Sequence, residues 1–158
     1  MQKLTPFLWF NDQAEEAAKY YVSIFDNSKF IGVTRYGDTG PGPAGSVMTA
    51  SFVLRGQEFT ALNGGPQFSF TPAISFVVYC EDQAEIDRYW EKLSEGGRKV
   101  ECGWLTDKYG LSWQIVPTLV MKLLAEGDDA KTERVMKKIM QMQKLEIAPL
   151  KEAYEQVG

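Results

Sequence analysis

The hydrophobic pattern of the first part of the chain predicts a strand, an amphipathic helix and three more strands. Leu4 to Phe10 form a compact apolar and aromatic run, typical of a buried or edge strand. Between residues 14 and 25 apolar side chains recur at three- and four-residue spacing, and Asn11 or Asp12 is placed to cap this helix. Strand-like segments follow at 29–36, 47–54 and 58–62, with a loop at the Gly- and Pro-rich residues 37–45.

A second copy of this pattern begins after residue 71. Ala73 to Cys80 is strand-like, and Asp82 stands where it would cap an amphipathic helix. The sequence then predicts a strand near 99–105, a turn at 107–110 and a strand at 111–116. The repeated order of elements indicates a tandem duplication.

The rest of the chain, residues 118–158, is helical in pattern. Asp128 or Asp129 would cap the second of its helices, and Pro149 would open a last short one. A methionine-rich stripe at Met136, Met140 and Met142 is typical of core packing or subunit contact, because methionine fills irregular apolar gaps.

Composition limits the choice of class. The 158 residues are 44% hydrophobic, enough for one core, and we expect a single domain. Within it, module 1 would cover about residues 2–66, module 2 about 71–117, and a helical tail 118–158. The net charge of −4 and the absence of a long basic cluster argue against nucleic acid as a partner. No signal-peptide pattern or long apolar stretch is present, so we expect no membrane contact and a cytoplasmic location.

The chain contains no histidine and only two cysteines, Cys80 and Cys102. Nucleophile systems that depend on histidine are therefore excluded, and a metal ion would have to rely on carboxylates, amides or thiolates. Two cysteines without metal-type spacing are typical of a reducing compartment.

Four segments carry a resemblance to a known superfamily. They read PFLWF at 6–10, GPGPAGSVM at 40–48, LNGGP at 62–66 and CGWLTDKYGLSWQIVP at 102–117. With the tandem pattern, the chain resembles the vicinal oxygen chelate superfamily of glyoxalases, dioxygenases and bleomycin-resistance proteins. More narrowly it is similar to the PhnB-like branch, often labelled 3-demethylubiquinone-9 3-methyltransferase-like.

The resemblance implies an α+β fold of two βαβββ modules that form a half-open barrel with a ligand cleft, usually within a homodimer. It also places the superfamily's metal positions near Thr5, Ala61, Ser75 and Gln114. These side chains are poor ligands for a divalent cation, so we expect neither a metal nor another cofactor.

The predicted cleft follows from this register and from the alternation of side chains along a strand. Its surface is apolar and aromatic with a few hydroxyls and amides, which suits a small, aromatic or hydrophobic molecule as the partner. The predicted cleft residues are Thr5, Phe7, Trp9, Ala61, Asn63, Ser75, Val77, Tyr79, Trp104, Ser112 and Gln114.

Alternatives remain at several positions. An enzyme of unknown reaction could use Cys102, the one plausible nucleophile, Tyr79, a substrate-assisted route or a metal site with unexpected ligands. The plain interpretation of Cys102 is an apolar filler. A methyltransferase that uses S-adenosylmethionine should show a Gly-rich turn after its first strand, which the sequence after Phe10 lacks. Asn63 could orient a ligand or shape a turn, Asp107 should shape its turn with Gly110, and residues 37–45 would form a flap or a dimer arm.

Overall fold

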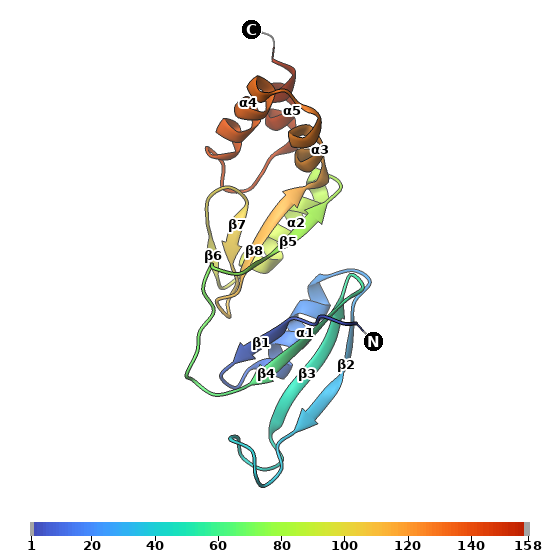
Figure 1. Cartoon of the computed structure of the whole chain (residues 1–158), viewed down its shortest axis with the longest axis vertical. Coiled ribbons are helices and arrows are strands. Elements are labelled where there is room, and N and C mark those ends of the chain that lie inside the picture. The colour runs from blue at the N-terminus through green and yellow to red at the C-terminus, as the bar shows by residue number, and fades with distance from the viewer. Residues whose placement is uncertain (1, 157–158) are drawn as a thin grey trace. The chain divides into compact units, whose positions relative to one another are not determined.

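The computed structural model describes residues 2–156. These residues form two compact units, with the boundary between Phe70 and Thr71 (Figure 1). Each unit contains one four-stranded sheet with a helix against one face. We call the opposite face of each sheet its open face. The order strand, helix, three strands is the same in both units, which confirms the predicted tandem βαβββ modules.

The first unit contains β1 (Phe7–Phe10), α1 (Ala14–Ile24), β2 (Lys29–Arg35), β3 (Val47–Leu54) and β4 (Gln57–Asn63). The sheet order is β1-β4-β3-β2, with β1 parallel to β4 and the other neighbours antiparallel. The apolar stripe of α1 packs against this sheet, and its buried members are Ala14, Ala17, Ala18, Tyr21 and Ile24.

The expected helix cap at Asn11 or Asp12 is wrong. The residue before α1 is Gln13, whose side chain makes no capping hydrogen bond. Instead, the amide oxygen of Asn63 accepts a hydrogen bond from the backbone N–H of Ala14 at 2.8 Å. The helix therefore takes its capping group from the end of β4, not from the residues that precede it.

The second unit begins with β5 (Ser75–Cys80), α2 (Gln83–Ser94), β6 (Arg98–Lys99), β7 (Trp104–Thr106) and β8 (Ser112–Pro117). Its sheet order, β5-β8-β7-β6, repeats that of the first unit, and β5 is again parallel to β8. The predicted cap of α2 is confirmed, because the Asp82 carboxylate accepts a hydrogen bond from Glu85 N at 2.9 Å.

The single strand expected near 99–105 is wrong. The structure has two short antiparallel strands there, β6 and β7, joined by a turn over residues 100–103. Cys102 (φ 61°) and Gly103 (φ 83°) are both in the left-handed region, which reverses the chain direction. Val100 N donates to Trp104 O at 2.9 Å and closes the turn.

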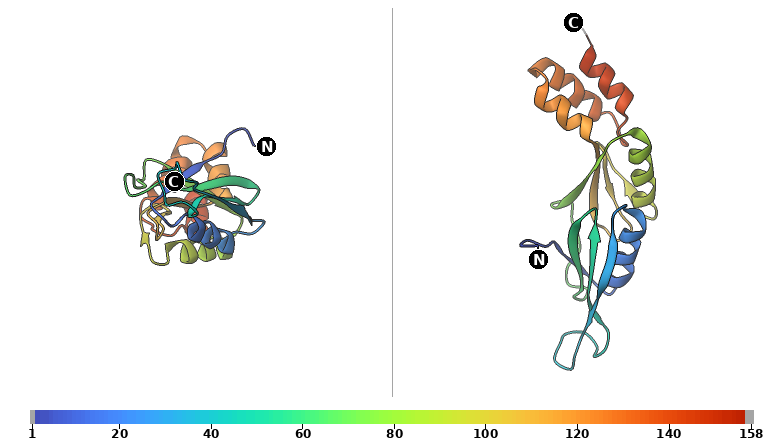
Figure 2. Two further views of the ribbon diagram at one scale, coloured as in Figure 1. Left: turned by 90° about the horizontal axis from the view of Figure 1, so that it is seen from below. Right: turned by 90° about the vertical axis from the view of Figure 1, so that its right-hand side faces the viewer.

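Three helices follow, α3 (Thr118–Glu126), α4 (Asp129–Ile139) and α5 (Ile147–Glu155), and they gather at one end of the second sheet (Figure 2). Asp128 caps α4 as predicted, while α5 begins two residues before Pro149. Their shared core consists of Val120, Leu123, Val135, Ile139, Leu145 and Leu150. None of the helices between residues 2 and 156 combines the length and hydrophobicity needed to span a bilayer.

The segment between α4 and α5 fixes these helices to the second module. Cys102 N and Gly103 N donate to the carbonyls of Met142 and Gln143 at 2.8 and 2.7 Å. On α2, Gln83 accepts from Ile147 N at 2.8 Å and donates to Leu145 O at 3.1 Å. The helical tail is thus held by both the β6–β7 turn and α2.

Candidate functional site

The open face of the second sheet presents side chains in regular rows. The strand register places Gln114 of β8 between Val77 of β5 and Trp104 of β7. The next row pairs Tyr79 with Val116. Alternate residues of the same strands, such as Val78, Leu105 and Ile115, are buried on the opposite face, so side chains in these rows point away from α2.

A pocket of about 270 Å³ lies over these rows. Five predicted residues line it together: Val77, Tyr79, Cys102, Trp104 and Gln114. The tail supplies the other walls, because α3, α4 and the segment before α5 all contribute apolar side chains. Val116, which alternation places on the same face as Gln114, also lines the pocket. The lining residues that the sequence did not predict are Val120, Met121, Leu124, Met136, Ile139 and Leu145.

The two methionines of this wall are unusually accessible. Met121 is 50% exposed and Met136 is 40% exposed, although both side chains line the pocket. Met142, from the same predicted stripe, packs against the tail core instead. The methionine-rich pattern therefore serves core packing at one position and a pocket wall at another.

Gln114 is the central polar group of this surface. Its Nε2 donates to Ser75 Oγ at 2.9 Å, which holds the amide plane in place. Within residues 2–156 the amide oxygen has no hydrogen-bond partner, and the neighbours of Gln114 in its row, Val77 and Trp104, are largely apolar. Ser75 and Ser112 lie in the next row of the face and are not among the residues that line the pocket.

Cys102 reaches the pocket from the β6–β7 turn. Its side chain is half-buried, and its backbone is held in the left-handed region by the hydrogen bond to Met142 O. A non-glycine residue in this region is energetically unfavourable and is retained only where the surroundings enforce it. The backbone of Cys102 is consequently held at the pocket wall.

The predicted residues of the first module do not form such a pocket. Thr5 is exposed before β1, and Phe7 is 59% exposed on the open face. Trp9 lies on the same face but is covered by its own module, since its Nε1 donates to Gly65 O at 2.9 Å and its ring packs edge-on against Phe68.

The expectation that Ala61 and Asn63 share the open face is wrong. Ala61 pairs with Leu8 and Ala50 and is fully buried on the face that α1 covers. Asn63 lies on the same side, where its amide caps α1 and donates to Val47 O at 3.1 Å. The residues that oppose Phe7 and Trp9 are Thr60 and Leu62, one position earlier along β4 in each case.

The residues at the expected metal positions do not fit a divalent cation. Ala61 carries no donor atom and faces α1, while Ser75 and Gln114 hydrogen-bond to each other. In the described part of the chain no group of three or more Cys, Asp or Glu side chains lies close enough to share an ion. Neutral hydroxyl and amide oxygens are weak substitutes for the carboxylates and imidazoles that divalent ions prefer.

The Gly- and Pro-rich loop packs on its own module. It surrounds Tyr36, which is 7% exposed and donates a hydrogen bond to Asn63 O. Gly40 and Gly42 touch the two sides of the ring so closely that a Cβ on either would lie within 2.5 Å of it. A hollow of about 630 Å³ lies between this loop, the start of α1 and the turn after β4, and its acidic side chains, Asp12 among them, are largely exposed.

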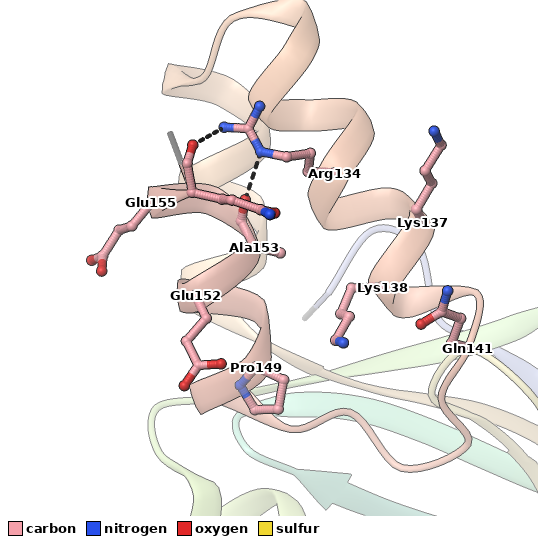
Figure 3. A pocket seen from close by; sticks show the side chains of 9 residues that line it. Arg134, Lys137, Lys138, Gln141, Pro149, Glu152, Ala153 and Glu155 are labelled. Atoms are coloured by element: carbon pink, nitrogen blue, oxygen red, sulfur yellow. Dashed lines mark hydrogen bonds between the residues drawn. The ribbon is translucent and has the colours of Figure 1, made fainter. Parts of the chain in front are cut away.

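A further groove, of about 620 Å³, runs between α4 and α5 (Figure 3). Arg134 crosses to the end of α5 and donates to the carbonyls of Ala153, Tyr154 and Gln156 at 2.8–3.3 Å. Lys137 points away from α5 and pairs with Glu133 at 3.5 Å. Arg134 therefore donates to carbonyl groups at the end of α5 that lack partners within the helix, which is a structural role.

Comparison with known proteins supports the predicted resemblance. The family model of 3-demethylubiquinone-9 3-methyltransferase matches residues 2–116. The PhnB protein from Bacillus cereus, whose structure carries the same label, is 42% identical with a TM-score of 0.67, over 73% of this chain and 99% of its own. A search of curated proteins found no match.

Two more distant structures share the fold. A Pseudomonas aeruginosa protein is 22% identical with a TM-score of 0.61, over 74% of this chain and 98% of its own. The fosfomycin resistance protein FosX from Mesorhizobium loti is 15% identical with a TM-score of 0.55, over 80% and 100%. The tandem βαβββ modules are thus those of the glyoxalase/bleomycin resistance fold, and the chain belongs to the 3-demethylubiquinone-9 3-methyltransferase family as a PhnB-like member of the vicinal oxygen chelate superfamily.

Proposed function

We propose that the protein binds a small aromatic or hydrophobic molecule, without a metal ion, in the pocket between the open face of the second sheet and the helical tail. The observation that carries this proposal is the convergence of Val77, Tyr79, Trp104 and Gln114 from three strands with Met121 and Met136 from the tail. Such a lining, mostly apolar with a few polar groups, is typical of small-molecule sites.

The volume of the pocket sets the scale of the ligand. In other proteins a cavity of about 150 Å³ takes a benzene-sized ring. The 270 Å³ found here is larger than that and accommodates one substituted ring. The relative FosX is named a fosfomycin resistance protein, but at 15% identity the two chains share the fold alone.

Toluene is a suitable probe, because it matches the size and the apolar character of the pocket. We expect it to shift the indole N–H signal of Trp104 in a ¹H–¹⁵N spectrum, with a dissociation constant on the order of 1 mM for so few heavy atoms. Dialysis against a chelator should leave this binding unchanged. No shift of the Trp104 signal at any accessible concentration would contradict the proposal.

A matched pair of variants tests the location. Met136→Trp places an indole inside the pocket and should abolish the toluene shift, whereas Met140→Trp adds the same group at a position that is 68% exposed and does not line the pocket. Both sites are accessible, so neither change should prevent folding. Equal effects of the two variants would place toluene elsewhere.

Catalysis is a second candidate, favoured by the position of Cys102 in the pocket wall. An enzyme that used this thiol would be alkylated by iodoacetamide at neutral pH much faster than a free cysteine, and the ligand would protect it. Slow alkylation would leave binding as the function. The methyltransferase activity in the family label predicts binding of S-adenosylmethionine, which calorimetry can detect.

Homodimerisation and a cytoplasmic location remain predictions. Several large apolar side chains are exposed, among them Leu4, Ile74 and Met140, and such residues are suited to a subunit contact. Sedimentation of the native protein measures the oligomeric state directly. A monomer under dilute conditions would contradict the dimer.

A further inference from the structure

The proposed pocket contains a hydrogen-bond acceptor, the amide oxygen of Gln114, on the strand surface that forms its floor. Gln114 is half-buried, and the register places it between the side chains of Val77 and Trp104. Its Nε2 is engaged by Ser75 Oγ at 2.9 Å, and within residues 2–156 its Oε1 has no partner. An apolar ligand would remove this oxygen from water without offering it a hydrogen-bond donor, which is unfavourable.

We propose that the site selects neutral aromatic molecules that carry a hydrogen-bond donor, such as a phenol, with Gln114 Oε1 as the acceptor. Ser75 acts as a positioning residue. By holding the amide NH₂ through Oγ, it keeps the oxygen turned to the pocket side. Because the described lining of the pocket includes no carboxylate to offset the removal of a cation from water, the site favours a neutral donor over a cation. This inference rests on the proposed function.

The test compares p-cresol with toluene, which differ by one hydroxyl group. In the wild-type protein p-cresol should bind about five- to tenfold more tightly than toluene, as expected for one hydrogen bond, with the Trp104 indole signal as the readout. Gln114→Met removes the acceptor while retaining the length and volume of the side chain. It should reduce the preference for p-cresol, measured as the ratio of the two dissociation constants, to near onefold.

Two further variants separate orientation from structure. Gln114→Glu retains acceptor oxygens and should keep a preference for p-cresol. Ser75→Ala frees the amide and should lower the preference about two- to threefold. Ser112→Ala is the matched control, because Ser112 pairs with Ser75 across the two strands and does not line the pocket. It should leave the preference intact.

The possible outcomes separate this inference from the proposed function. If toluene and p-cresol both shift Trp104 with equal affinity, or if Gln114→Met retains the preference, the acceptor role is overturned and aromatic binding stands. If neither compound shifts the Trp104 signal, the acceptor role of Gln114 and the proposed binding function are both contradicted. Loss of the preference in Gln114→Met, with both compounds still shifting the Trp104 signal, supports the inference.

Discussion

The two modules have the same scaffold but differ in what surrounds their open faces. Both sheets place the first strand parallel to the last, and Phe7 and Trp9 correspond in register to Val77 and Tyr79. In the first module the loop after β4 covers Trp9. In the second, α3, α4 and the segment before α5, all added after β8, form a wall over the face. Duplication of the scaffold therefore does not duplicate the site, which depends on the added segment.

The hairpin before the last strand shows the same divergence. In the first module Arg55 and Gly56 form a tight turn with φ of 49° and 84°. In the second, the turn is built around Asp107, which is 2% exposed. Its carboxylate accepts hydrogen bonds from Tyr109 N, Leu111 N and Trp113 Nε1 at 2.8–3.1 Å. One turn depends on backbone conformation and the other on a buried side chain.

Asp107→Ala should produce the largest loss of stability. It leaves three donors without their acceptor near the core, and we expect the free energy of unfolding to fall by roughly 3–5 kcal/mol. Urea denaturation followed by far-UV circular dichroism measures the change. The hydrogen bonds that Asp107 accepts from Tyr109 N and Leu111 N confirm the predicted role of this residue in shaping the turn.

The matched change in the first module is Gly56→Ala. A Cβ at Gly56 meets nothing within 4 Å, so only its positive φ is unfavourable, at about 1–2 kcal/mol. Asp107→Asn retains one acceptor oxygen, so its loss of stability should lie between those of Asp107→Ala and Gly56→Ala. An Asp107→Ala variant no less stable than Gly56→Ala would contradict the distinction between the two turns.

Helix capping provides a second, smaller contrast. Asn63→Ala removes the acceptor for Ala14 N and leaves Val47 O without its donor, so a loss of about 1–2 kcal/mol is expected. Asp82→Ala removes a cap at an exposed helix end and should lower stability by about 1 kcal/mol. The same denaturation experiment compares them. A larger effect at Asp82 would show that the distant cap is dispensable.

The sequence predicted local elements well and long-range partners poorly. Asp82 and Asp128 cap their helices as predicted, because each is adjacent to the N–H groups that it binds. Asn63 caps α1 from 49 positions further along the chain, and no local pattern indicates such a contact. The turn at Cys102 and Gly103 was missed since a cysteine rarely adopts positive φ.

The pocket was predicted only in part, because local patterns do not always decide which face of a strand or helix meets a distant segment. The register implied by the resemblance gave the correct face for Val77, Tyr79 and Gln114, although residues 76–79 of β5 are all apolar. In β4 the neighbours Ala61 and Leu62 are both apolar, so alternation could not decide the phase, and burial under α1 does. Met121 and Met136 could not be placed, because a helical stripe does not identify the surface it will meet.

The smallest expected effect concerns an ion pair that joins the tail to α2. Asp87 Oδ1 accepts hydrogen bonds from Lys144 Nζ at 2.8 Å and from Gln83 Nε2 at 3.0 Å. These bonds, that from Lys144 first, hold the pKa of Asp87 below its ordinary value, although burial acts in the opposite direction. The side chain is 48% exposed, so water and salt screen the pair and it contributes under about 1 kcal/mol.

The direction of the pH effect follows from the lowered pKa. Between the pKa of the folded state and the higher one of the unfolded state, the unfolded chain binds more protons. The contribution is thus fully present above the unfolded value and disappears as the pH falls through the folded one. Asp87→Asn should be less stable than wild type at pH 7, and this difference should vanish in strong acid. Asp38→Asn, in the exposed Gly/Pro loop, is the matched control. An equal loss of stability in Asp38→Asn would show that the Lys144 pair does not stabilise the docked tail. A stability difference between Asp87→Asn and wild type that grows in acid would show the same.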